Sequence, residues 1–95
     1  MAFVSIRTVE GDPKELLPKY DQVAAKALAN RAPGLIMHSC IELDDALRVV
    51  NMFESEAQAR EAARRQVLLE ALEEAGLPTT DPEIFRVHNY RIFAD

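Results

Sequence analysis

The side chains best suited to chemistry in this chain are one histidine, one asparagine and one arginine, all in segments that alternate like β-strands. A histidine side chain changes its charge near neutral pH, so His38 can serve as a general base or proton shuttle. The amide of Asn51 can orient a phenol or stabilise an enolate-like oxygen. Arg7 can hold an anionic or phenolic oxygen, because a buried guanidinium requires an acceptor. We therefore interpret His38, Asn51 and Arg7 as candidate catalytic residues.

Each of these residues also has a structural interpretation. His38 could be a histidine hydrogen-bonded at the sheet or at a dimer interface, and Asn51 could form a cross-strand hydrogen bond and nothing more. Arg7 could pair with Glu42 or with an acidic residue of a second subunit. Alanine substitution of His38 and Asn51 separates the two interpretations, because a catalyst loses turnover and keeps its fold, whereas a structural pair loses stability.

A hairpin over residues 34–55 is expected to bring His38 and Asn51 together. Two apolar runs flank Asp44-Asp45, whose short side chains suit a tight turn. With that pair as the loop, His38 lies opposite Asn51 on the same face. This face carries Ile36, His38, Cys40, Glu42, Leu47, Val49, Asn51 and Phe53. The other face carries Met37, Ser39, Ile41, Leu43, Arg48, Val50 and Met52. Because the second face is the more apolar, we expect it to pack on the helices, while the mixed first face lines a cavity.

The other segments predict two helices and two further strands. Residues 2–10 and 84–93 alternate as strands, and residues 55–75 follow a helical pattern that opens with a capping box. A helix is expected over about 18–31, because Pro18 would interrupt or kink a helix begun earlier. The order β-α-β-β-α-β predicts a ferredoxin-like α+β fold, a single antiparallel sheet with two helices on one face.

Length and composition restrict the classes of function. The 95 residues form one domain, and the net charge of −5 without a basic cluster disfavours nucleic-acid binding. Cys40 is the only cysteine, which excludes an internal disulfide and suits a cytoplasmic protein. No signal peptide or membrane span is expected. The two histidines lie in no ligand spacing with carboxylates, and the three glycines suit turns, so no metal, nucleotide or other cofactor is expected.

A homodimer is expected from the apolar character of the predicted cavity face. Beside the hairpin residues, that face carries Phe3 and Val9. Exposing it would create an apolar patch larger than soluble monomers usually tolerate. A second copy stacked sheet on sheet would cover it and enclose a pocket in each subunit.

The chain resembles the dimeric α+β barrel superfamily, and within it the antibiotic-biosynthesis-monooxygenase-like domains. The resemblance rests on Pro33-Gly34 at the start of a strand and on the pattern from Val49 through Phe53-Glu54-Ser55 to Gln58, which leads into a helix. It covers almost the whole chain. Members include cofactor-free monooxygenases acting on polycyclic phenols, polyketide cyclases, haem-degrading enzymes and muconolactone isomerase-like enzymes.

Two departures from the family pattern restrict what the resemblance implies. Family members commonly have tryptophan where this chain has Phe53, and the chain contains no tryptophan. The haem-degrading branch has an asparagine where Arg7 aligns, and a haem-ligating histidine on the second helix, where this chain has none. Haem degradation is therefore disfavoured.

The resemblance implies a homodimer that binds a small, apolar, aromatic molecule. If the protein is an enzyme, the implied reaction is cofactor-free oxygenation of a phenolic or polyketide-like substrate. The alternatives are a polyketide cyclase or isomerase, and a non-catalytic binding or stress-associated module. The residues expected to contact the ligand are Ser5, Ile36, Cys40, Val49, Phe53, His88 and Tyr90.

Three of these binding residues keep an alternative interpretation. Cys40 has no neighbouring motif that would lower its pKa, so a small apolar filler is favoured over a nucleophile. His88 and Tyr90 share one face of the last strand. That face could line the pocket, pack on the helices or contact a second subunit.

Overall fold

The order of helices and strands follows the predicted β-α-β-β-α-β pattern, with the second helix divided in two. The computed structural model describes residues 1–93. The elements are β1 (Phe3–Glu10), α1 (Pro13–Ala29), β2 (Leu35–Glu42), β3 (Ala46–Phe53), α2 (Glu56–Ala62), α3 (Gln66–Ala75) and β4 (Glu83–Arg86). No helix in this range is long and apolar enough to span a membrane.

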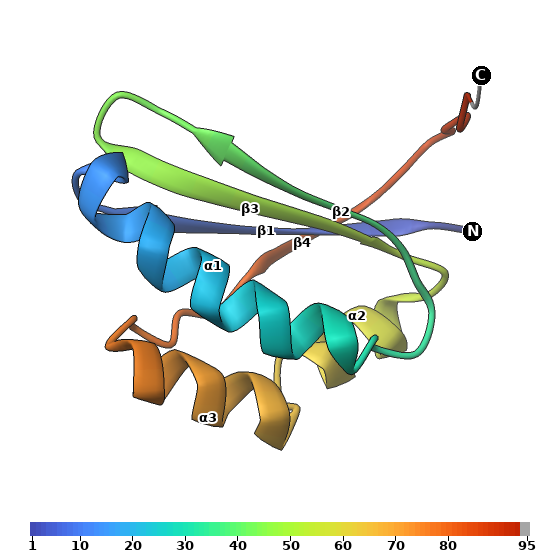
Figure 1. The fold of residues 1–95 in the computed structure, drawn as a ribbon. Helices are drawn as coiled ribbons and strands as arrows, with labels where there is room; N and C mark the ends of the chain where they lie inside the picture. Colours follow the sequence, from blue (N-terminus) through green and yellow to red (C-terminus); the bar gives the residue numbers. More distant parts are fainter. Residues whose placement is uncertain (94–95) are drawn as a thin grey trace.

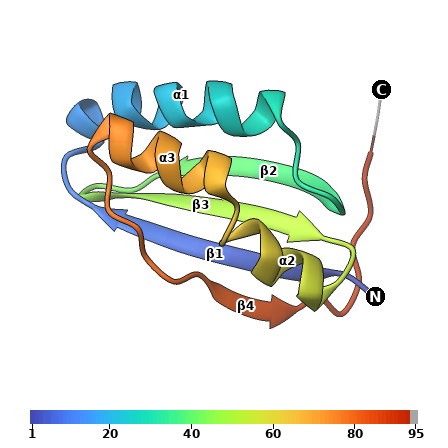
Figure 2. The same ribbon diagram turned by 90° about the horizontal axis from the view of Figure 1, so that it is seen from below.

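The four strands form one antiparallel sheet with the order β2-β3-β1-β4. The two central strands, β1 and β3, are separated in sequence by α1 and β2, and all three helices lie on one face of the sheet (Figures 1 and 2). Helices α1 and α3 pack against each other, and α2 lies over one end of the sheet. This arrangement confirms the ferredoxin-like α+β fold.

Helix α1 begins earlier than the sequence predicted and continues through Pro18. Asp12 caps its first turn by accepting a hydrogen bond of 3.0 Å from the backbone N–H of Lys14, and Pro13 occupies the first turn, where no backbone donor is needed. Pro18 removes one hydrogen bond from the helix, but its ring is exposed. The cap and the packing of the apolar face, including Val23, keep the helix continuous.

The predicted second helix is interrupted at residues 63–65. Arg65 has extended backbone angles and precedes α3, although neither glycine nor proline marks the break. Its guanidinium donates a hydrogen bond of 2.6 Å to the carbonyl oxygen of Asn30, just after α1. The break allows α3 to pack on α1, where Val23, Ala71, Leu72 and Ala75 form a buried cluster.

The predicted hairpin register is confirmed near the loop and shifts near Gly34. His38 pairs with Asn51 and Ser39 with Val50, as expected. An irregularity between Leu35 and Met37 then places Leu35, rather than Ile36, opposite Phe53. Because of this shift, Leu35 and Met37, on either side of Ile36, point to opposite faces of the sheet.

The prediction of which face packs on the helices is wrong. Leu47 and Phe53 are 2% and 3% exposed and lie beneath the helices on the same face as His38 and Asn51. The opposite face, which we expected to pack on the helices, is open in the sense that no helix covers it (Figure 2), although Met52 on it is only 4% exposed. It carries Val4, Ile6, Met37, Ile41, Val50, Met52 and Phe85. We had assumed that the more apolar face packs on the helices. This assumption failed because the helix-covered face carries a polar site within the core.

The last strand is shorter than predicted. Phe3 at the start of β1 pairs with Arg86 at the end of β4, so no residue of β1 remains to pair with the chain beyond. One further hydrogen bond of 2.9 Å joins the N–H of Val87 to the carbonyl of Ala2. The following residues leave the end of the sheet on the side away from the helices (Figure 1).

Candidate functional site

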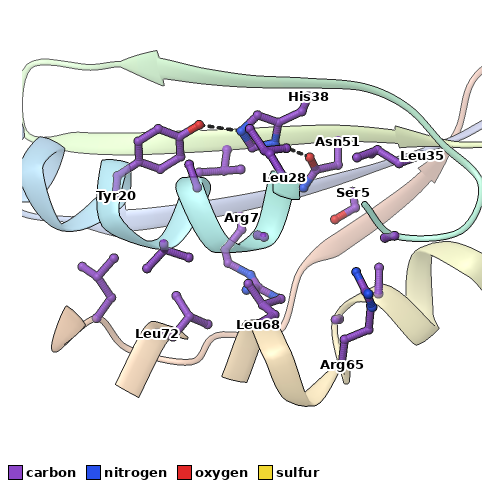
Figure 3. Close-up of a pocket in the computed structure, with 18 of the residues that line it drawn as sticks. Ser5, Arg7, Tyr20, Leu28, Leu35, His38, Asn51, Arg65, Leu68 and Leu72 are labelled. Carbon is purple, nitrogen blue, oxygen red and sulfur yellow. Dashed lines mark hydrogen bonds between the residues drawn. The ribbon is translucent and has the colours of Figure 1, made fainter. Parts of the chain in front are cut away.

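A cavity of about 140 Å³ lies between the sheet and the helices of the same chain. Its walls are mostly aliphatic and come from α1, α3 and the covered face of the sheet (Figure 3). The apolar side chains include Leu16, Val23, Leu28, Leu68 and Leu72 from the helices and Leu47, Val49 and Phe53 from β3. The sequence analysis expected a pocket in each subunit on the sheet face away from the helices, enclosed by a second copy; the structure corrects this position, because the cavity lies beneath the helices.

A row of polar side chains crosses three strands beneath α1. Ser5 pairs with Asn51 across β1 and β3, and Asn51 pairs with His38 across β3 and β2. All three residues line the cavity. Ser5 is only 7% exposed, so the row is a polar strip within an otherwise apolar wall.

His38 forms hydrogen bonds through both ring nitrogens. Its Nδ1 lies 2.5 Å from Oδ1 of Asn51, and its Nε2 lies 2.5 Å from the hydroxyl of Tyr20 (Figure 3). An amide oxygen only accepts, so Nδ1 carries a proton and donates to Asn51. In the neutral ring Nε2 is then an acceptor, and the Tyr20 hydroxyl donates to it. The asparagine thus determines which nitrogen can take up a further proton.

Tyr20 belongs to this hydrogen-bonded chain but was not among the candidate residues chosen from the sequence. Its position in α1 matches the apolar spacing of a helix, which hides it among the packing residues. A buried tyrosine hydroxyl usually requires a partner, and that requirement is the signal that could have identified it. Burial, and then the negative charges of a Cys40 thiolate and Asp21, raise the pKa of Tyr20. The hydroxyl therefore remains a donor at neutral pH.

Arg7 extends from β1 into the space between the sheet and α3 (Figure 3). Burial lowers the pKa of its guanidinium, and the charge of Asp81 partly offsets this effect. Within residues 1–93 the guanidinium forms no hydrogen bond or salt bridge, and the alternative pairing with Glu42 is not observed. Arg7 is thus a cation in the cavity wall that a ligand can reach.

Four of the expected ligand contacts lie outside the cavity lining. Ile36 is at the irregularity of β2, and Cys40, on the same strand, lies opposite Val49. Burial and then the charges of Glu42 and Asp21 raise the pKa of the Cys40 thiol. This direction makes Cys40 a poor nucleophile at neutral pH. His88 and Tyr90 are exposed beyond the end of β4, because that strand has no partner residues left.

Within the described residues, no group of three or more histidine, cysteine, aspartate or glutamate side chains is placed to hold a metal ion. The polar groups of the cavity are instead an imidazole, a phenol, an amide, a hydroxyl and the two guanidinium groups of Arg7 and Arg65. Together they can move a proton and stabilise negative charge on an oxygen.

Solved structures of several other proteins share this fold. SnoaB from Streptomyces nogalater, described as a cofactor-independent oxygenase, has a TM-score of 0.64 and 22% identity over 94% of this chain and 93% of that chain. A protein from Caulobacter crescentus, provisionally described as an antibiotic biosynthesis monooxygenase, has a TM-score of 0.66 and 18% identity over 95% and 91%. Rv0793 from Mycobacterium tuberculosis has a TM-score of 0.65 and 12% identity over 99% and 100%.

These structures confirm, at the level of the fold, the resemblance to antibiotic-biosynthesis-monooxygenase-like domains. No family model and no curated protein sequence matches the chain. The likeness to these structures therefore concerns the fold, and the chemistry depends on the side chains of the cavity.

Proposed function

We propose that the protein binds a small phenol in the cavity between the sheet and the helices and oxidises it with molecular oxygen, without a cofactor. The observation that carries this proposal is the hydrogen-bonded chain of Tyr20, His38 and Asn51 in the wall of an apolar cavity. The description of SnoaB as a cofactor-independent oxygenase supports the same chemistry on this fold.

The chain of hydrogen bonds provides a path for the phenol's proton. A phenol O–H directed at the Tyr20 oxygen passes its proton to that oxygen while the Tyr20 proton moves to Nε2 of His38. The resulting imidazolium keeps its Nδ1–H bond to Asn51. Because the pKa of Tyr20 is raised, the tyrosine transmits the proton and does not remain ionised. Arg7 then stabilises the phenolate charge from β1.

The reaction balances without an external reductant. An electron-rich phenolate reacts with oxygen directly; the ring loses two hydrogen atoms and gains one oxygen atom, and the second oxygen atom leaves as water. The product is a quinone. The protein's contribution is to deprotonate and orient the phenol and to keep bulk water away from the ring.

The size of the cavity favours a ligand with one ring. A cavity of about 150 Å³ with aliphatic walls is known to hold benzene, and the volume here is about 140 Å³. A polycyclic phenol, which the family resemblance implied, would require α1 or α3 to move away from the sheet. We therefore place monocyclic phenols first among the candidate substrates.

We also propose that the open face of the sheet is covered by a second copy of the chain. Met37, Ile41 and Phe85 on this face are 45%, 43% and 49% exposed. Two identical apolar faces can stack about a two-fold axis, and each copy then covers the other. This homodimer uses the face opposite to the one that the sequence analysis chose, and each cavity stays within one chain.

The same hydrogen bonds favour one alternative function. The hydrogen bond between Tyr20 and His38 joins α1 to β2. The same hydrogen bonds can therefore stabilise the fold of a ligand-binding module that performs no reaction. A cyclase or isomerase could use the same proton path without oxygen. Dependence of the reaction on oxygen separates these possibilities.

The experiment is an oxygen-uptake assay with a panel of monocyclic phenols, with product analysis under labelled ¹⁸O₂. We expect one labelled oxygen atom in the product and a loss of activity in His38→Ala. The matched control is His88→Ala, because His88 is exposed and outside the cavity lining. Saturable phenol binding without oxygen uptake would identify a binding module, and turnover under nitrogen would identify a cyclase or isomerase.

A further inference from the structure

A second, polar pocket lies next to the cavity, between β1, α2 and the segment that joins α3 to β4. Its polar lining consists of Arg7, Arg60, Arg64, Thr79, Thr80 and Asp81. Arg7 and Ala63 line both the pocket and the cavity. The two spaces therefore adjoin at the side chain of Arg7.

The charge of this pocket is opposite to that of the chain. Three guanidinium groups face one carboxylate, that of Asp81, in a protein with a net charge of −5. A chain with an excess of acidic residues repels anions in general, so a cluster of arginines is a local exception. Arginine is also the side chain best suited to bind an oxyanion, because its planar fork matches two oxygen atoms.

Arg7, Arg60 and Arg64 form no ion pair shorter than 3.4 Å within the described residues. Arg60 lies 3.4 Å from Glu56 and Arg64 lies 3.9 Å from Glu61, and all four side chains are exposed. Exposed pairs of this kind contribute little and exchange readily. Arg7 has no partner within residues 1–93, and burial lowers the pKa of its guanidinium. An oxyanion in the pocket would supply the acceptor that Arg7 lacks.

Besides Arg7, a second group in the pocket lacks a partner within the described residues. The side-chain oxygen of Thr80 is buried, and within the described residues it has no hydrogen-bond partner. Buried polar atoms are satisfied in most proteins, and an exception often marks a bound molecule. The hydroxyl can donate to an oxyanion held by the arginines.

We propose that this pocket is an oxyanion-binding site formed by Arg7, Arg60, Arg64 and Thr80. The oxyanion has two possible sources. It can be the acid group of the cavity ligand, since Arg7 adjoins both spaces. The substrate would then be a phenolic acid that presents its acid group, in place of its phenolate oxygen, to Arg7; this version rests on the proton path of the proposed function. It can also be a free anion that binds beside an occupied cavity.

The first test uses sulfate alone and does not depend on the proposed function. The ¹H–¹⁵N NMR spectrum is recorded during a titration with sodium sulfate at constant ionic strength. We expect saturable shifts of the backbone signals of Thr79 and Thr80 and of the Nε signal of Arg7. In the double variant Arg60→Gln/Arg64→Gln, the affinity should fall at least tenfold. Shifts that do not saturate, or that are equal in this variant, would overturn the proposal.

Arg48→Gln is the matched control for the loss of positive charge. Arg48 is exposed on the open face of the sheet, the face opposite to Arg7, and is not in the pocket lining; its Nε donates to the Thr8 hydroxyl at 3.3 Å. The sulfate affinity should be unchanged in this variant. An equal loss of affinity there would show a general charge effect and contradict the site.

The second test separates the two sources of the oxyanion with phenol and 4-hydroxybenzoate. If the acid group belongs to the cavity ligand, 4-hydroxybenzoate displaces sulfate and shifts the signals of Thr80 and Asn51 together, whereas phenol shifts only that of Asn51. If the anion binds independently, sulfate and 4-hydroxybenzoate bind at the same time. Both results support an oxyanion site. Absence of any phenol shift would contradict the proposed function and leave the sulfate result valid.

Discussion

The hydroxyl of Tyr20 lies 2.5 Å from Nε2 of His38, and the two ring planes are parallel to within 1°. The ring centroids are 6.0 Å apart, so the hydrogen bond accounts for the contact better than face-to-face packing does. The lone pair of Nε2 lies in the plane of the imidazole, and a parallel phenol ring presents its hydroxyl in a suitable direction. The tyrosine on α1 and the histidine on β2 are therefore joined by a hydrogen bond along which a proton can pass.

Replacement of Tyr20 by phenylalanine should remove the first step of this path and keep the ring that fills the wall. We expect the rate of phenol oxidation to fall by roughly 100-fold or more, the range for loss of a general acid–base group. The free energy of unfolding should fall by only about 1 kcal/mol, for one lost hydrogen bond. Steady-state kinetics and urea denaturation measure the two effects. Tyr90→Phe is the control, because Tyr90 is exposed; an equal loss of rate there would contradict the assignment.

Replacement of Asn51 by leucine should release the histidine from its fixed tautomer. With no acceptor at Nδ1, the proton can move to Nε2, which then donates to the Tyr20 oxygen and can no longer accept from it. Long-range ¹H–¹⁵N NMR correlations distinguish the two ring nitrogens. We expect a protonated Nδ1 in the natural protein and a mixture of tautomers, with reduced activity, in Asn51→Leu. A protonated Nε2 in the natural protein would contradict the direction of the proton path.

The pairing of His38 with Asn51 was predictable from sequence because a short loop and strict alternation leave few registers. The face on which they lie was not. A rule based on apolarity chose the face of Met37 and Ile41, but a polar site within the core makes the covered face the less apolar one. Wherever a cavity containing polar groups lies under helices, apolarity alone can assign the faces in reverse.

Two further differences have local physical causes. The alternation of residues 84–93 continues past Arg86, but a strand requires a neighbour, and β1 begins at Phe3. The break before Arg65 has no glycine or proline signal, because it results from the packing of α3 on α1. The end of β4 and the break before α3 both depend on contacts between segments that are distant in sequence. The residue pattern of a single segment therefore cannot predict them.

The protein should lose stability in alkaline solution through Tyr20 and Cys40. Burial raises the pKa of both groups in the folded chain, so the folded state holds their protons more firmly than the unfolded state does. Their contribution is complete below the ordinary pKa values, which begin at about 8.5 for cysteine, and is lost as pH rises from there through the raised pKa values of the folded chain. Thermal unfolding at several pH values tests this. The double variant Tyr20→Phe/Cys40→Ala should show a smaller decrease; an equal decrease would assign the effect to other groups.

Gly34 should tolerate alanine less well than Gly76, although both have positive φ angles of 80° and 74°. A Cβ at Gly34 would collide with the amide of Gln58, which accepts a hydrogen bond of 3.0 Å from the Ser55 hydroxyl at the start of α2. A Cβ at Gly76 would meet no atom within 4 Å. Gly76→Ala should cost about 1–2 kcal/mol for the left-handed backbone, and Gly34→Ala about 1 kcal/mol more for the lost hydrogen bond. Urea denaturation compares them, and equal costs would exclude the clash.

The open face of the sheet should determine the oligomeric state. Met37→Glu and Val50→Glu place charges at residues that face away from the helices, where two copies would bury them against each other. In sedimentation velocity we expect the natural protein to be a dimer and the double variant a monomer with unchanged helix content. Glu10→Lys, at an exposed residue on the edge of the turn to α1, is the control for a change of net charge and should remain dimeric. A dimer that survives both glutamates would place the interface elsewhere, for example on the exposed side chains of Ile92 and Phe93.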